Sequence, residues 1–221
     1  MSDYNIDEKQ VLPDLVFENA KEAEKKYFQE HPDSLILSFE QELRNLGFQF
    51  EISSQINQFM PKYKKIILPI AIKYYEQAKY DNEKNFFINL FHFKGFDEVV
   101  PLLIKDFFEP TTSEHNRWFI ADCLYQISSK QYMDDYIKII SDSAYGINRQ
   151  MIILLVGKLK SEKAIPVLIE LLEDESVRLQ AIAALGYYKR EEFRPYFEKF
   201  QNSKHSGWRK YAKAALKKLD Y

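Results

Sequence analysis

Apolar residues recur along most of the chain with the spacing of one helix face, and the same arrangement returns after each of four arginines. Arg117, Arg149, Arg178 and Arg209 are separated by 32, 29 and 31 residues. Apolar residues follow each arginine by three, six and seven positions, a spacing that traces one face of an α-helix. The pattern therefore predicts four helices that turn this face inward. The predicted core positions are Ile120, Cys123, Leu124, Ile152, Leu155, Val156, Ala181, Ala184, Leu185, Ala212, Ala215 and Leu216.

A second pattern lies upstream, where Pro69, Pro101, Pro166 and Pro195 each precede an apolar stretch. Proline is tolerated in the first turn of a helix, because the N–H that it lacks has no intrahelical partner there. These prolines, together with Asp135 at the corresponding place before Arg149, predict a further helix before each second helix, so that each repeat is a helix pair. Lys84 begins a fifth, bulkier copy of the arginine helix.

Neither helix of such a pair can bury its apolar stripe alone, so neighbouring pairs must stack. The sequence therefore predicts an all-α fold, a right-handed α-solenoid (superhelix) of about five helix pairs. Residues 61–221 would form it as one continuous domain. The first helices of the pairs are expected at 62–78, 95–108, 129–141, 161–173 and 190–201, with Ser161 as one N-cap. The second helices are expected at 82–93, 115–127, 147–158, 175–187 and 206–219.

Residues 1–60 do not follow the repeat and are expected to form an N-terminal helical cap. An amphipathic helix is predicted over 14–31, and a second helix is predicted to begin at Asp33 as N-cap and to end at Gly47. The apolar face of the first helix would carry Phe17, Ala20, Ala23 and Tyr27. Such a pair would cover the exposed apolar face of the first repeat.

Composition limits the class of protein. Hydrophobic residues make up 46% of the chain, which supports a real core, and Cys123 is the single cysteine, so an intrachain disulfide is excluded. Its apolar helical surroundings predict a buried thiol. The acidic N-terminus lacks the apolar segment of a secretory signal, and the longest apolar run, 66–72, is too short to span a bilayer. A cytoplasmic location with no membrane association is the default expectation.

Charge is distributed unevenly along the chain. Residues 1–60 carry 5 basic and 12 acidic side chains, whereas residues 189–221 carry 10 basic and 4 acidic ones, or +6. The last helix is basic through Arg209, Lys210, Lys213, Lys217 and Lys218. Either this end is a solvated cap whose cations favour the helix C-terminus, or it attracts an acidic protein or nucleic acid.

The stretch AIPVLIELLEDESVRLQAIAALG, residues 164–186, resembles a HEAT repeat of the short bacterial type that also occurs in phycobilisome lyase subunits. The matching features are Pro166, Leu171, Leu172, Asp174, Val177, Arg178, the alanines and Gly186. The resemblance extends over about 62–219. It implies that Arg117, Arg149, Arg178 and Arg209 form a structural ladder, each pairing with an acidic residue or carbonyl at the turn, and Asp174 is a local candidate for Arg178. The alternative is that these arginines bind phosphates or acidic side chains.

Trp118 and Asp122 are neighbours at i and i+4, off the core face of their helix. The pair is similar to one in the HEAT-like alkylpurine DNA glycosylases. That resemblance implies that Trp118 and Asp122 would contact a cationic modified nucleotide and that Arg149 would lie near a phosphate. The chain departs from that family because its later helix has no tryptophan, so Tyr187 or Tyr188 would have to substitute. Its net charge of −2 also lacks the basic character typical of DNA-binding proteins.

No other chemistry is indicated by motif. The four histidines share no metal-ligand spacing, and neither a nucleophile motif nor a glycine-rich phosphate loop occurs. We therefore expect no metal and no cofactor. The pattern favours a protein without catalytic activity, and an enzymatic function stays open as the alternative.

The favoured hypothesis is a non-catalytic HEAT-repeat scaffold that binds a macromolecular partner, most simply a protein, on the concave surface lined by the second helices. The alternatives are a HEAT-like DNA glycosylase or DNA-binding protein that acts on alkylated bases, and a dedicated protein inhibitor or immunity factor. The candidate binding residues are off the core register: Trp118, Asp122, Tyr125, Gln150, Leu154, Tyr187, Lys210 and Lys213.

Overall fold

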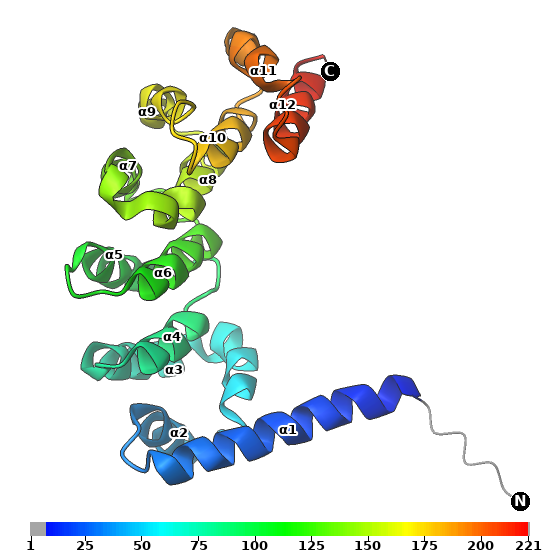
Figure 1. The fold of residues 1–221 in the computed structure, drawn as a ribbon. Coiled ribbons are helices and arrows are strands. Elements are labelled where there is room, and N and C mark those ends of the chain that lie inside the picture. Colours follow the sequence, from blue (N-terminus) through cyan, green and yellow to red (C-terminus); the bar gives the residue numbers. More distant parts are fainter. Residues whose placement is uncertain (1–7, 221) are drawn as a thin grey trace, which may run out of the picture. The chain divides into compact units, whose positions relative to one another are not determined.

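The chain folds into helices throughout the residues that the structure describes, 8–220, and within that range it contains no β-strand (Figure 1). The structure is a computed structural model, and the burial of side chains is described for residues 17–220. The predicted all-α, HEAT-like solenoid fold is confirmed. Contacts within the chain divide it into two compact units, Met1–Leu90 and Phe91–Tyr221. This division lies where internal contacts are fewest, whereas the expected boundary near residue 60 is where the repeat begins. The assignment of residues 1–60 as a cap stays a prediction.

The first unit packs around a group of aromatic side chains. Phe39 is fully buried, and its ring lies 5.3 Å from Phe87 and 5.7 Å from Tyr74 in edge-on contacts. Such edge-to-face pairs are more favourable than the buried area alone accounts for. The elements of this unit are α1 (Glu8–Glu30), α2 (Leu35–Asn45), the 3-10 helix η1 (Ser53–Gln58), α3 (Met60–Gln77) and α4 (Asp81–Leu90).

Three details of the first unit differ from the prediction or refine it. Helix α1 begins at Glu8 rather than near residue 14, and Ala20 and Ala23 on its expected apolar face are exposed. The N-cap of α2 is Ser34, whose Oγ accepts a hydrogen bond from the N–H of Ile36, so the expected cap at Asp33 is wrong by one residue. Gly47 ends α2 with a φ of +91°, as its position predicted, because glycine adopts this left-handed conformation without strain.

The second unit is a stack of helix pairs in two layers (Figure 1). The first helices of the pairs are α5 (Val100–Phe108), α7 (Met133–Ser141), α9 (Ile165–Glu170) and α11 (Arg194–Phe200). The second helices are α6 (Glu114–Ile127), α8 (Gln150–Lys158), α10 (Arg178–Leu185) and α12 (Ser206–Leu219). Each second helix packs against the next, α6 on α8, α8 on α10 and α10 on α12.

Three of the first helices begin in the same way, with one turn of 3-10 helix followed by proline. The turns are η2 (Asp97–Val99), η4 (Glu162–Ala164) and η5 (Glu191–Phe193), and they lead into α5, α9 and α11. Pro101, Pro166 and Pro195 occupy the first turn of these helices, as predicted. Ser161 is the N-cap residue before η4, as predicted, although its side chain makes no capping hydrogen bond there.

The predicted core positions of the second helices are buried, with Leu216 near the chain end only partly so. Two glycines among these helices allow unusually close packing. A Cβ on Gly157 would lie 2.6 Å from the Cα of Ala184, and a Cβ on Gly186 would lie 3.2 Å from the Cβ of Ala215. Helices α8, α10 and α12 therefore approach one another more closely than larger residues at these two positions would permit.

Candidate protein-interaction surface

The four arginines of the repeat hold the turn between the two helices of each pair. The guanidinium of Arg117 donates to the carbonyls of Phe107, at 3.0 Å, and Glu109, at 2.8 Å, at the end of α5. Arg178 donates in the same way to Leu172, at 2.5 Å, and Arg209 donates to Ser203, at 2.5 Å. A cation at these carbonyls is favourable, because a helix C-terminus leaves its last acceptors unpaired and carries partial negative charge.

Arg149 extends this arrangement from one repeat to the next. It is only 2% exposed, donates to the carbonyls of Ile140 and Gly146 at 3.2 and 2.9 Å, and pairs with the Oδ2 of Asp174 at 2.5 Å. Asp174 was expected to pair with Arg178 of its own repeat, and that expectation is wrong. Hydrogen bonds from Ser176, which has the larger effect, and from Arg149 hold the pKa of Asp174 below its usual value.

Arg178 pairs with a carboxylate other than that of Asp174, and it also contacts the following repeat. Its Nη1 lies 3.2 Å from Glu175, and its guanidinium lies 4.4 Å from the centre of the Trp208 ring on α12. Arg117 likewise faces the ring of Tyr145 in the next repeat, at 5.6 Å. These contacts favour a structural role for the arginines. Arg149 is buried and fully engaged within the protein, and the phosphate contact that the glycosylase resemblance implies for it stays a prediction.

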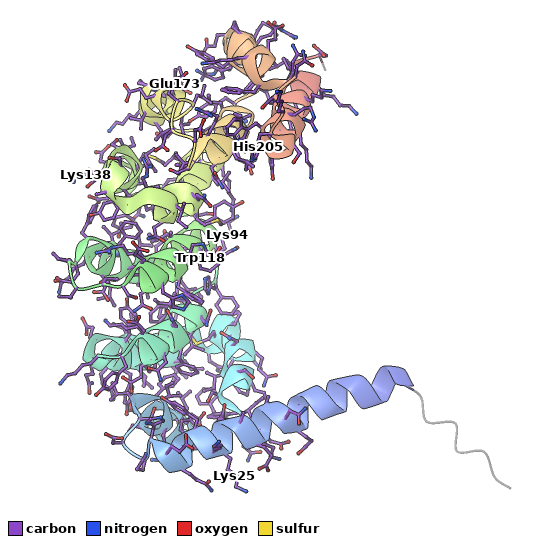
Figure 2. All side chains as sticks on the ribbon, viewed as in Figure 1. Lys25, Lys94, Trp118, Lys138, Glu173 and His205 are labelled. Carbon is purple, nitrogen blue, oxygen red and sulfur yellow. The ribbon has the colours of Figure 1, made fainter. Side chains whose placement is uncertain are left out.

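Trp118 and Asp122 lie on α6, and Figure 2 labels Trp118 there. The indole is 44% exposed, which is high for a large aromatic side chain. The carboxylate of Asp122 is engaged within the protein, because its Oδ2 lies 3.2 Å from the Nε2 of His92. The sequence did not indicate His92 as a partner of Asp122, because it precedes Asp122 by 30 positions and follows the end of α4 at Leu90.

A row of tyrosine and lysine side chains crosses the second helices of this unit. Lys158 on α8 lies 4.4 Å from the ring centre of Tyr125 on α6, and its Nζ donates to the Oγ of Ser128 at 2.8 Å. Lys218 on α12 lies 5.6 Å from the ring of Tyr187, which follows α10. We call Tyr125, Lys158, Tyr187 and Lys218 the Tyr–Lys row.

The row is continuous across its middle. Tyr187 lies close to Tyr125, and partial burial, followed by the proximity of Tyr125, raises the pKa of Tyr187. All four residues follow the arginine of their repeat by eight or nine positions. This shared register can be read from the sequence, but it predicts a continuous surface row only when successive second helices are known to pack side by side.

The remaining candidate residues lie on the same second helices, and all eight predicted positions are at least partly exposed. The side chain of Gln150 donates to the carbonyl of Ser176 at 3.0 Å, which ties it to the neighbouring turn. Lys210 and Lys213 are exposed on α12. Among the predicted residues, the structure brings Tyr125 and Tyr187 into direct contact.

Within the part of the chain that the structure describes, no three His, Cys, Asp or Glu side chains gather in a way that could hold a metal ion. None of the helices described combines the length and the apolar character required to cross a bilayer.

The fold and the repeated arginine turns are those of a HEAT-like α-solenoid. Comparison with family models agrees, since the model described as HEAT repeats matches residues 133–217, from α7 to the last turn of α12. The match covers less than half of the chain, and it falls within the more regular repeats. A search of curated proteins gives no match.

Proposed function

We propose that this protein is a non-catalytic scaffold that binds an acidic segment of a protein partner across the second helices of residues 91–221. HEAT repeats often serve protein interaction, and the feature that supports this proposal most directly is the Tyr–Lys row. Tyrosines held in place by neighbours offer large contact surfaces at low cost in side-chain entropy. The lysines beside them carry the positive charge that would pair with acidic side chains of the partner.

The charge of this region favours an acidic partner. The row ends on α12, which also carries the exposed Lys210, Lys213 and Lys217, and residues 189–221 have a net charge of +6. Electrostatic complementarity of this kind increases the rate of association and selects the partner. The acidic stretches of a protein would therefore be attracted to the α12 end of the row.

The geometry of the stack suggests a spacing for the acidic residues. Lys158 and Lys218 lie on α8 and α12, which are separated by one helix. Packed helices lie about 8–10 Å apart, so the two lysines are roughly 16–20 Å apart along the stack. An extended peptide spans about 3.3 Å per residue, so acidic side chains about five or six residues apart would match both lysines.

A direct test uses fluorescently labelled peptides with two glutamates separated by two to nine residues. We expect the tightest binding at a separation of five or six. The double variant Lys158→Gln, Lys218→Gln should weaken that binding by about tenfold, because two solvent-exposed charge contacts are lost and each is worth less than a buried one. The matched control is Lys138→Gln, Lys163→Gln, which changes two exposed lysines outside the second helices and should have little effect.

Two results would count against the proposal. Equal weakening by both double variants would mean that only net charge matters. Tighter binding of a single-stranded oligonucleotide, lost in the Lys158, Lys218 variant, would instead identify the surface as a nucleic-acid interface. The glycosylase and inhibitor hypotheses stay predictions, and release of methylated purines that disappears in Asp122→Asn would favour the first of them.

A further inference from the structure

The first unit contains a cavity that plays no part in the proposed interaction surface. It has a volume of about 520 Å³ and lies between α1, α2, η1 and α4. Apolar side chains form most of its wall: Ala23, Tyr27, Phe28, Ile36, Phe86 and Leu90. Both its size and its lining are typical of sites for small organic molecules.

Polar residues complete the lining: Glu24, Ser53, Ser54, Asn57 and Asn89. Glu24 lines the cavity from α1, and both of its carboxylate oxygens accept from the backbone N–H of Ser53, at 3.1 and 3.0 Å. Asn57 lines it from η1, and its Oδ1 is buried without a hydrogen-bond partner among the described residues. A buried acceptor that lacks a donor costs free energy, which a ligand with an N–H group would recover.

The charges around Glu24 do not balance. Glu40 is 3% exposed, accepts from the Oγ of Ser53, and pairs with Arg44 at 3.0 Å. The guanidinium of Arg44 therefore pairs with Glu40 and not with Glu24, so among the described residues the carboxylate of Glu24 lies beside an apolar cavity without an ion pair. Burial raises the pKa of Glu24, and the charge of Glu40 adds to that effect while Arg44 opposes it.

Nearby lysines on α1 do not supply the missing positive charge. Lys21 pairs with Glu51 at 2.6 Å on the exposed surface. Lys25, the residue after Glu24, is exposed and labelled on the outer side of α1 in Figure 2. A cation within the cavity would therefore find an uncompensated carboxylate, and it would also lie close to aromatic rings that attract cations.

We infer that this cavity binds a small organic cation, a primary amine carried on an apolar or aromatic body. The ammonium group would donate to Glu24 and to the Oδ1 of Asn57. The apolar body would lie among Tyr27, Phe28 and Phe86. The site is independent of the Tyr–Lys row, so either proposal can fail without affecting the other.

The test compares 2-phenylethylamine with its neutral isostere 2-phenylethanol on the full chain, by calorimetry or by ligand-observed NMR. We expect the amine to bind at least about tenfold more tightly, since one charge-assisted contact is worth about this ratio. Glu24→Gln should remove the preference for the amine, because glutamine can still accept from Ser53 but carries no charge. The matched control is Glu22→Gln, an exposed carboxylate on the same helix that does not line the cavity.

A second variant separates loss of charge from loss of fold. Ala23→Trp places a large side chain at the cavity wall from an exposed helix position, and it should abolish binding of both compounds while the helical content is unchanged. Equal affinity for the amine and the alcohol in the unmodified protein would refute the inference. A preference for the amine that persists in Glu24→Gln, or binding of the amine that persists in Ala23→Trp, would refute it as well.

Discussion

At the scale of single residues, the most informative contact joins Arg149 to Asp174, because it connects one helix pair to the next. The guanidinium is almost fully buried and uses all three of its nitrogens within the protein. A buried charge of this kind is tolerated only when it is paired and hydrogen-bonded. Asp174 is therefore expected to stabilise the stack as well as its own turn.

We predict that Asp174→Asn lowers the free energy of unfolding by about 2 kcal/mol at neutral pH, because Arg149 loses its charged partner. The folded-state pKa of Asp174 is lowered, so its contribution is present above the unfolded-state pKa and is lost as the pH falls through the folded-state pKa. Urea titrations of both proteins at pH 7 and at successively lower pH should show the difference shrinking in acid.

The control for this prediction is Glu175→Gln. Glu175 pairs with Arg178 but is 79% exposed, so its loss should cost less than about 0.5 kcal/mol. A difference between Asp174→Asn and the unmodified protein that does not depend on pH would contradict the assignment of the effect to charge.

The sequence predicted which arginines matter but not what they contact. Their regular spacing and the carbonyls of the preceding turn could be inferred from the repeat. The partner of Asp174 could not, because Arg149 precedes it by 25 positions while Arg178 follows it by only four. Local spacing favours the nearer residue, whereas stacking of the helix pairs brings the more distant residue into contact.

At the scale of helices, a recurring feature is the left-handed residue that ends three of the second helices. Ser128, Lys160 and Lys189 have φ values of +58°, +53° and +55°, and each follows its arginine by 11 positions. Non-glycine residues adopt this conformation at a cost, which glycine avoids. The repeat therefore places modest strain at the same point in three successive pairs.

We predict that Lys160→Gly raises the free energy of unfolding by about 0.5–1 kcal/mol, since it relieves this strain. The same replacement at Lys105, an exposed position within α5, should instead lower it by about 1 kcal/mol. Thermal and urea unfolding of the two variants side by side would check both signs, and a loss of stability in Lys160→Gly would show that the strain is not there.

Most helices could be predicted because their apolar periodicity extends over two turns or more. The 3-10 helix η1 was missed because its sequence, SSQINQ, contains a single apolar residue, Ile56, and so has no periodicity to detect. The prolines indicated where the first helices begin, but not that one 3-10 turn comes before them. Elements of three residues are too short to leave a repeating pattern.

At the scale of the whole molecule, stability is expected to depend on contacts between adjacent helix pairs. Within the second unit the main contacts join α6 to α8, α8 to α10 and α10 to α12. Helix α11 also packs against α12. Such stacks behave approximately as a chain of nearest-neighbour interactions. Loss of the last helix, α12, should therefore destabilise its neighbour α10 more than any other helix.

We predict that removal of α12, by ending the chain at Lys204, speeds amide hydrogen exchange by about tenfold or more in α10, while α6 changes much less. The reason is that α12 covers the apolar face of α10 and supplies the Trp208 ring that faces Arg178. Exchange followed by mass spectrometry would resolve the two helices. Equal acceleration in both would mean that the unit unfolds as a whole.

Neither proposed site could be predicted as a site from the sequence. The Tyr–Lys row combines residues of three helices and of the turn after α10, and the cavity combines four elements of the first unit. The uneven charge was visible in the sequence. Which charges remain uncompensated was not, because that depends on pairs such as Glu40 with Arg44 and Lys21 with Glu51 that form only in the folded chain.

The reactivity of the Cys123 thiol reports how often helix α6 opens. It is the single cysteine of the chain and lies fully buried in α6, and burial raises its pKa well above the usual value. A disulfide reagent reacts with the exposed thiolate, so labelling requires α6 to open first. The rate at which the intact protein reacts therefore measures how often this one helix leaves the stack, without any engineered probe.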